Sequence, residues 1–352
     1  MTERPLSDSI EAVRRRFGGD LTIVGHHYQA EEVIRHTDLR GDSLELARKC
    51  AALDSRWIMF CGVYFMAESA ALLARPGCEV HLPEPSAECS MAMMSPAPLL
   101  DAVLGKLSAT GRKIVPLAYV NSTLAVKAVV GRHGGSVCTS ANAVTMLRWA
   151  LGRGDAVLFL PDKNLGRNTA DRLGIPQREC HVLNIREQGG RIDQDVADRA
   201  KLLLWPGFCS IHTRFAVRQV ERLRAENPGA RVVAHPECTP EVVAAADAAG
   251  STSFIIRYAD EMPDGGTLVI GTEINLVERL AEQHRHRLHI LPLVESACTH
   301  MAQTTEERLA EALDALAESA DMGKASPFLV RIDDDLTIPA RKALECMLAV
   351  CS

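Results

Sequence analysis

Pairs of polar side chains follow three of the apolar runs in this sequence. The two residues of each pair are spaced i, i+2, so they point to the same side of an extended chain and can act on one ligand. Their residue types are suited to proton transfer and to the binding of carboxylates. The pairs are His26 and Tyr28, Tyr119 and Asn121, and His235 and Glu237.

A cysteine ends a later apolar run in each of the same three stretches. These cysteines are Cys89, Cys209 and Cys298, and none of the eleven cysteines belongs to a C-x-x-C motif. The absence of that motif excludes zinc fingers, thioredoxin-type pairs and ferredoxin-type runs. Three sulfur ligands from distant parts of the chain suit a [4Fe–4S] cluster with one open iron. The alternative is a zinc site completed by His212, three residues after Cys209.

The spacing of these landmarks indicates a threefold internal repeat. From the first residue of the polar pair to the cysteine is 63 residues in the first and third stretches and 90 in the second. The additional residues of the second stretch lie mostly in a polar segment around 174–201. Each stretch has the pattern strand, helix, strand, helix, strand, which predicts a small parallel sheet flanked by helices.

The predicted fold class is α/β, with three similar Rossmann-like αβα domains around a pseudo-threefold axis and a central active-site cavity. Ligands of such sheets bind beyond the carboxyl ends of the strands, where the polar pairs and the cysteines stand. The predicted domains span residues 1–97, 98–210 and 211–298. The C-terminal segment 299–352 has helical periodicity and is expected to pack on the first domain.

Small hydroxyl residues precede a helical pattern in each stretch. They are Ser43, Ser140, and Ser251 with Thr252. Serine and threonine cap helix N-termini, where free N–H groups also favour an anion. A plain helix cap and an anion site are both consistent with this pattern.

Composition limits the class of protein. The chain has 352 residues, 47% of them hydrophobic and 24% charged, and a formal net charge of −6. Without a basic run it is not suited to bind nucleic acid or anionic lipid. No apolar stretch is long enough to span a membrane, and Met1 to Pro5 lack the apolar core of a signal peptide, so we expect a cytoplasmic protein.

Motifs spread over residues 21–301 make the chain resemble the quinolinate synthase family. The carriers include Gly25–Gln29, Gly41–Leu46, Tyr119–Ser122, Thr139–Ala143, Pro161–Gly166, Trp205–His212, His235–Cys238, Gly250–Thr252 and Cys298–Met301. The resemblance implies a transferase that condenses iminoaspartate (iminosuccinate) with dihydroxyacetone phosphate. The product would be quinolinate, with release of phosphate and two waters, in de novo NAD biosynthesis. It also implies a possible functional link to an L-aspartate-oxidising enzyme.

The same resemblance implies roles for individual residues. Cys89, Cys209 and Cys298 would hold a [4Fe–4S] cluster whose open iron acts as a Lewis acid. The implied catalytic residues are Glu237, Tyr28, His235 and Tyr119, with Glu237 as the base and a raised pKa expected from its burial. The implied substrate-binding residues are His26, Ser43, Tyr119, Asn121, Ser140, His212, His235, Glu237, Ser251 and Thr252.

Two other functions use the same three cysteines. One is a different cluster-dependent hydro-lyase of the aconitase kind, which would turn over a hydroxy acid without releasing phosphate. The other is a non-enzymatic iron–sulfur sensor. The absence of a DNA-binding motif and of a basic face disfavours the sensor.

Overall fold

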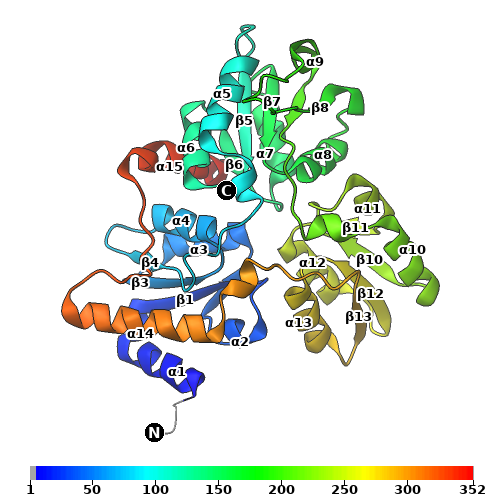
Figure 1. Cartoon of the computed structure of the whole chain (residues 1–352). Helices are drawn as coiled ribbons and strands as arrows, with labels where there is room; N and C mark the ends of the chain where they lie inside the picture. Colours follow the sequence, from blue (N-terminus) through cyan, green and yellow to red (C-terminus); the bar gives the residue numbers. More distant parts are fainter. Residues whose placement is uncertain (1–4, 352) are drawn as a thin grey trace. The chain divides into compact units, whose positions relative to one another are not determined.

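The computed structural model describes residues 5–351. Residues 1–4 and 352 lie outside the described part. Residues 1–4 are the start of the predicted first domain and make up most of the segment that was compared with a signal peptide. The chain forms two compact units. The first comprises the residues up to Cys89 together with Ala297–Asp333, and the second comprises Ser90–Ser296 together with the residues from Asp334 onward (Figure 1).

The first unit contains one parallel four-stranded sheet in the order β2-β1-β3-β4. Its strands are β1 (Leu21–His26), β2 (Leu39–Gly41), β3 (Trp57–Cys61) and β4 (Glu79–His81). Its helices are α1 (Leu6–Phe17), α2 (Glu31–Ile34), α3 (Ser43–Ala52), α4 (Tyr64–Leu73) and α14 (Glu306–Met322).

Side chains along the central strands alternate between the two faces of this sheet, and each face is covered by different helices. Leu21 and Ile23 of β1, together with Met59 of β3, pack in one buried cluster with Leu309 and Leu313 of α14. Alternate residues of a strand face the same side, so this face is covered by α14 and by α1, which packs beside it. The other long helices of the unit, α3 and α4, pack against each other.

The second unit contains two parallel sheets. The first has the order β6-β5-β7-β9-β8. Its strands are β5 (Ile114–Tyr119), β6 (Ser136–Cys138), β7 (Ala156–Leu160), β8 (Cys180–Val182) and β9 (Leu202–Leu204). The helices of this part are α5 (Ala97–Leu107), α6 (Leu124–Arg132), α7 (Ala143–Leu151), α8 (Lys163–Arg172), α9 (Gln194–Arg199) and α15 (Asp334–Val350).

The other sheet of the second unit has the order β11-β10-β12-β13. Its strands are β10 (Arg231–Ala234), β11 (Ala248–Ala249), β12 (Gly266–Gly271) and β13 (Leu288–Pro292). Its helices are α10 (Val217–Glu226), α11 (Pro240–Ala245), α12 (Thr252–Glu261) and α13 (Ile274–His284). Its core includes Val232 and Ala234 of β10 and Val269 of β12, all fully buried.

These sheets confirm the α/β fold class with three parallel-sheet domains. The predicted pattern of three strands in each stretch is wrong, because an additional edge strand of two or three residues stands beside the first strand in every sheet. These strands are β2, β6 and β11. The polar segment at 174–201 supplies a further strand, β8, and helix α9, which accounts for the greater length of the middle stretch.

The C-terminal segment divides between the two units. Helix α14 packs on α1 in the first unit, as expected. Helix α15 packs on α6 and β6 in the second unit, so the prediction that all of residues 299–352 cover the first domain is wrong for α15. Gly131 of α6 explains the close approach, because a side chain there would collide with the backbone carbonyl of Pro339 in α15.

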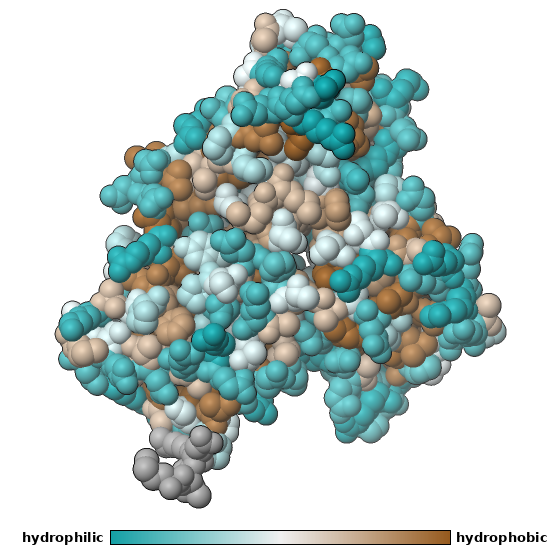
Figure 2. Space-filling model, in the orientation of Figure 1, coloured by the Kyte–Doolittle hydropathy of each residue, from teal (hydrophilic) through white to brown (hydrophobic). Residues whose placement is uncertain are grey.

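Polar side chains cover most of the face drawn in Figure 2. The large hydrophobic side chains that remain exposed within residues 5–351 are Met93, Val182, Met322 and Ile338. No helix in this described range combines the length and the apolar character needed to cross a membrane.

Candidate active site

The strand register brings each polar pair next to the start of a helix. The last residues of the first strand and of its edge neighbour pair side by side: His26 with Gly41, Tyr119 with Cys138, and Ala234 with Ala249. The hydroxyl clusters follow directly after these edge strands. Each sheet therefore presents its polar pair and its hydroxyl cluster at the same carboxyl edge.

The helix starts differ in what they can offer an anion. Asp42 caps α3, because its carboxylate accepts hydrogen bonds from the backbone N–H groups of Leu44 and Glu45. Ser43 is the next residue and the first residue of the helix. Ser251 caps α12, with Thr252 as the first helical residue, whereas Ser140 precedes the α7 cap, Asn142.

Two histidines share one local geometry. The ring Nδ1 of His26 accepts a hydrogen bond from the backbone N–H of Tyr28 at 3.1 Å, and Nδ1 of His235 accepts one from the backbone N–H of Glu237 at 3.4 Å. A neutral ring with Nδ1 as acceptor carries its proton on Nε2. Both histidines are therefore set to donate a hydrogen bond from Nε2.

Burial controls the charge of His235. Burial, with a smaller contribution from the neighbouring His212, lowers the pKa of His235 to about 3. The ring is therefore neutral at physiological pH. Of the two roles to which its residue type is suited, donation to a carboxylate fits this neutral ring better than proton transfer.

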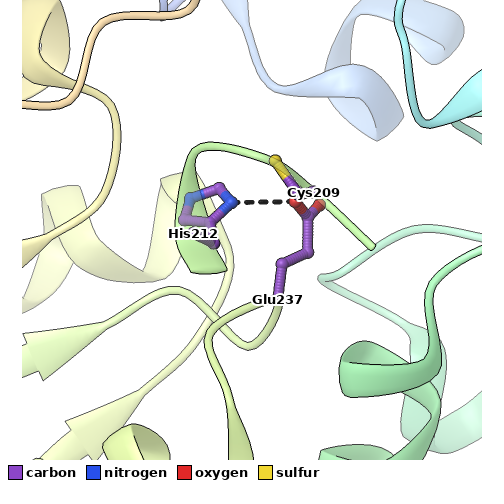
Figure 3. A group of neighbouring side chains, drawn as sticks. All are labelled: Cys209, His212 and Glu237. Atoms are coloured by element: carbon purple, nitrogen blue, oxygen red, sulfur yellow. Dashed lines mark hydrogen bonds and ion pairs between the residues drawn. The ribbon is translucent and has the colours of Figure 1, made fainter. Parts of the chain in front are cut away.

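Glu237 stands at the centre of a buried hydrogen-bond network. Its side chain comes from the loop after β10 and is 3% exposed. One carboxylate oxygen accepts from the Tyr119 hydroxyl at 2.5 Å, and the other lies 2.8 Å from Nδ1 of His212 (Figure 3). His212 also stacks on His235, with ring centroids 4.4 Å apart. Residues from both sheets of the second unit thus meet at one carboxylate.

The expected rise in the pKa of Glu237 is wrong. Burial alone would raise this pKa, but the hydrogen bonds that His212 and Tyr119 donate outweigh burial and hold it below its ordinary value. Donors aimed at a carboxylate stabilise its charged form. Glu237 is therefore ionised across the physiological pH range.

A cysteine completes this group. Ligand atoms of Cys209, His212 and Glu237 all lie within 4.8 Å of one another (Figure 3). Because an ionised carboxylate can only accept, His212 Nδ1 carries the proton between it and Glu237, while Nε2 lies 3.2 Å from the Thr272 hydroxyl. A metal ligand needs an unprotonated nitrogen, so Nε2 is the ring nitrogen of His212 that could serve, while Cys209 supplies the sulfur of the group.

Three of the half-buried cysteines have similar surroundings. Cys89, Cys209 and Cys298 are half-buried, and each stands three residues before a short 3₁₀ helix (Ala92–Met94, His212–Arg214 and Met301–Gln303). The three therefore share one local structure. By contrast, burial raises the pKa of Cys50 and of Cys61 to about 12, so these thiols stay protonated.

Cys238 packs in the core of the sheet formed by β10 to β13. Its side chain is fully buried, and its thiol donates to the backbone carbonyl of Gly271 at 3.7 Å. Burial raises the pKa of this thiol.

Comparison with known proteins identifies the family. The model of the family described as quinolinate synthetase A protein matches residues 8–349. The chain belongs to the quinolinate synthase family. Among its relatives, the quinolinate synthase of Geobacillus kaustophilus is 42% identical, over 99% of this chain and 95% of that protein.

Two further relatives give the same result. The quinolinate synthase of Corynebacterium glutamicum is 42% identical, over 97% of this chain and 86% of its own length. That of Acidobacterium capsulatum is 40% identical, over 99% of this chain and 94% of its own length.

In this quinolinate synthase family member, five predicted site residues meet in the second unit. They are Tyr119, Cys209, His212, His235 and Glu237. Four more predicted residues belong to the same unit: Asn121, Ser140, Ser251 and Thr252. Asn121 Oδ1 is buried and has no hydrogen-bond partner within residues 5–351, as expected of an atom that binds a ligand.

The remaining predicted site residues belong to the first unit. They are His26, Tyr28, Ser43, Cys89 and Cys298. The rings of His26 and Tyr28 pack edge to face with centroids 4.7 Å apart. The i, i+2 pair of the first stretch is thus in contact.

Sequence reasoning missed four residues that hold the network in place: Asp162, Asn164, Asn168 and Thr272. Asp162 accepts a hydrogen bond from the backbone N–H of Cys209, and Thr272 contacts His212. Asp162 and Thr272 stand two residues and one residue after the end of a central strand, close to the strand ends where the polar pairs stand. That position was the signal that could have found them.

Proposed function

We propose that this protein is a quinolinate synthase, a transferase that condenses iminoaspartate with dihydroxyacetone phosphate. The products would be quinolinate, phosphate and two waters, in de novo NAD biosynthesis. Family membership over residues 8–349 supports the proposal. The observation that carries it is the buried carboxylate of Glu237 with its donors Tyr119 and His212 beside the Cys209 sulfur.

The proposed cofactor is a [4Fe–4S] cluster held by Cys89, Cys209 and Cys298. The fit rests on the shared local structure of these half-buried cysteines and on the thiol chemistry of the donor set. When bound, such a cluster supplies a Lewis acid at its open iron, which polarises carboxylate and hydroxyl oxygens.

The reaction is proposed to include conversion of dihydroxyacetone phosphate, a ketose phosphate, to the corresponding aldose. Glu237 is proposed as the general base of this conversion, with Tyr119 as its hydrogen-bond partner. Its low pKa keeps it ionised and ready to accept a proton, at the expense of basicity. Both substrates are anions, and negative charge placed nearby raises the pKa of a carboxylate. Substrate binding would therefore strengthen the base at the moment when it is needed.

The neutral histidines are proposed to bind substrate carboxylates. Nε2 of His235 and of His26 can each donate without adding a full charge. Tyr28 is proposed to assist proton transfer beside His26, and Asn121 to accept from the substrate through its buried Oδ1. Ser43, Ser140, Ser251 and Thr252 are proposed to donate hydroxyl hydrogen bonds to the phosphate or carboxylates.

The direct test is product formation. Protein reconstituted anaerobically with iron and sulfide is mixed with dihydroxyacetone phosphate and iminoaspartate, freshly generated by an L-aspartate-oxidising enzyme. We expect quinolinate and phosphate in equal amounts. An intact cluster without quinolinate would reject the proposal. Turnover of a hydroxy acid alone, without phosphate release, would instead support the aconitase-like alternative.

A further inference from the structure

The aspartate at the start of α8 does more than cap that helix. One oxygen of Asp162 accepts from the backbone N–H groups of Asn164 at 2.7 Å and Leu165 at 2.9 Å, which is an ordinary cap. The other oxygen accepts from the backbone N–H of Cys209 at 3.1 Å. The side chain is fully buried. A cap needs only the first oxygen, so the second contact requires another explanation.

The backbone around Asp162 reinforces this contact. The N–H of Lys163 donates to the carbonyl of Gly207 at 3.0 Å. A Cβ at Gly207 would come within 2.5 Å of the carbonyl oxygen of Pro161, so this close approach requires glycine. The loop that carries Cys209 is therefore held against the start of α8 at two points.

Two asparagines of the same helix hold the loop that carries Glu237. The side-chain Nδ2 of Asn168 donates to the carbonyls of Pro236 at 2.7 Å and Cys238 at 2.9 Å. Nδ2 of Asn164 donates to the carbonyl of Glu237 itself at 3.3 Å. The two asparagines are spaced i, i+4 and so lie on one face of α8. Both are at least nine-tenths buried.

We propose that Asp162, Asn164 and Asn168 form a positioning bracket, which we call the α8 bracket. It fixes the Cys209 loop and the Glu237 loop, which come from different sheets, relative to one helix. Its members are positioning residues, because each acts through the backbone of Cys209 or of residues 236–238. The functional meaning of the α8 bracket rests on the proposed function, since it presumes that Cys209 binds the cluster and that Glu237 accepts a proton as the general base.

The two loops can be released separately. In Asp162→Asn the side chain keeps a single acceptor oxygen, so it can cap α8 or accept from Cys209 but not both. The cap satisfies two N–H groups, so the Cys209 N–H is the one left without its acceptor. Asn168→Ala removes both bonds to the Glu237 loop and leaves the cap intact. Thr169→Val is the matched control, because it deletes a buried hydrogen bond to Leu165 within the same helix.

Hydrogen exchange measured by mass spectrometry tests the bracket without relying on activity. In anaerobically prepared full-length protein, we expect Asp162→Asn to speed exchange about tenfold in peptides covering 207–210. We expect Asn168→Ala to speed exchange about tenfold in peptides covering 235–238. Thr169→Val should change neither segment. Wild-type exchange in both loops of both variants would overturn the proposal.

Cluster retention and kinetics test the functional meaning. We expect Asp162→Asn to lose iron to an anaerobic chelator about tenfold faster than wild type. Asn168→Ala should keep the wild-type rate of iron loss and the wild-type KM within about twofold, but lower kcat at least tenfold. Equal iron loss in Asp162→Asn and Thr169→Val, with unchanged kcat in Asn168→Ala, would reject these roles.

These experiments also distinguish a failure of the proposed function from a failure of the α8 bracket. If the wild-type protein makes no quinolinate, the proposed function fails, while hydrogen exchange still decides whether the bracket holds the two loops. If Asp162→Asn does not fold, Gly207→Ala replaces it, because the added carbon would collide with the carbonyl of Pro161 and displace the Cys209 loop from the start of α8. Unchanged exchange at 207–210 in that variant then counts against the bracket.

Discussion

A carboxylate as buried as Glu237 would ordinarily be neutral, because burial disfavours charge. Here two donors reverse that outcome. Tyr119 and His212 each give a hydrogen to one carboxylate oxygen, and charge-assisted hydrogen bonds of this kind are the strong ones. The identity of the donors, rather than the degree of burial, therefore sets the charge of the site.

We predict that Glu237→Gln keeps the fold and the cluster but abolishes ring formation. Glutamine has the same shape, its oxygen can still accept from His212, and its amide can donate to the Tyr119 hydroxyl. It cannot take up a proton, and loss of a general base lowers kcat by about 10²–10⁴-fold. The measurement is quinolinate formed per cluster. Wild-type turnover would remove Glu237 from the mechanism.

His235 makes stability depend on pH with a definite sign. Its pKa is about 3 in the folded protein and about 6.5 in an unfolded chain. Between these values the unfolded chain binds a proton that the folded protein does not. Stability from this residue is therefore present above pH 6.5 and is lost as the pH falls toward 3.

We predict a smaller pH effect in His235→Phe, which retains an aromatic ring against His212. Between pH 7 and pH 5 the wild-type free energy of unfolding should fall by about 2 kcal/mol more than that of the variant. Urea unfolding of both proteins in the same cluster state measures the difference. Burial also lowers the pKa of His81 to about 4, but this contribution is common to both proteins. Parallel pH curves would contradict the low pKa of His235.

At the scale of elements, strand register determines where the predicted site residues lie. The polar pairs and hydroxyl clusters were predictable because each follows a strand end, and the register sets them side by side. The edge strands β2, β6 and β11 were not, because two or three residues show no recognisable apolar pattern. The contact of α15 with α6 was also hidden, since it depends on shape at Gly131 rather than on periodicity.

We predict that Gly131→Ala destabilises the second unit by about 2 kcal/mol, as expected when an added methyl group meets fixed backbone. The added carbon would collide with the carbonyl of Pro339 in α15. The control is Gly105→Ala in α5, where nothing lies within 4 Å of the added carbon. That change should be neutral or stabilising, because alanine is the better helix former. Urea unfolding compares the variants, and equal stabilities would refute the packing role of Gly131.

The site illustrates what sequence can predict and what it cannot. Tyr119, Cys209, His235 and Glu237 were predicted because their positions recur along the chain, and His212 because of its spacing from Cys209 and the family resemblance. The ionisation of Glu237 and the role of Asp162 depend on which atoms face them, and no sequence pattern reports that. The failed expectation of a raised pKa came from counting burial without the donors.

At the scale of the whole molecule, the account depends on cysteines from both units. Cys89 and Cys298 belong to the first unit and Cys209 to the second. The three proposed ligands are far apart in sequence, so no short motif indicates them. Their shared placement three residues before a 3₁₀ helix is the structural counterpart of the sequence repeat.

The most direct measurement is the cluster content of single cysteine variants. Iron, sulfide and visible absorbance are measured after anaerobic purification of Cys89→Ser, Cys209→Ser and Cys298→Ser, with Cys50→Ser and Cys346→Ser as controls. We predict that the first three each lose the cluster and the activity, and that both controls keep them. A Cys209→Ser protein with full cluster absorbance would contradict the central claim.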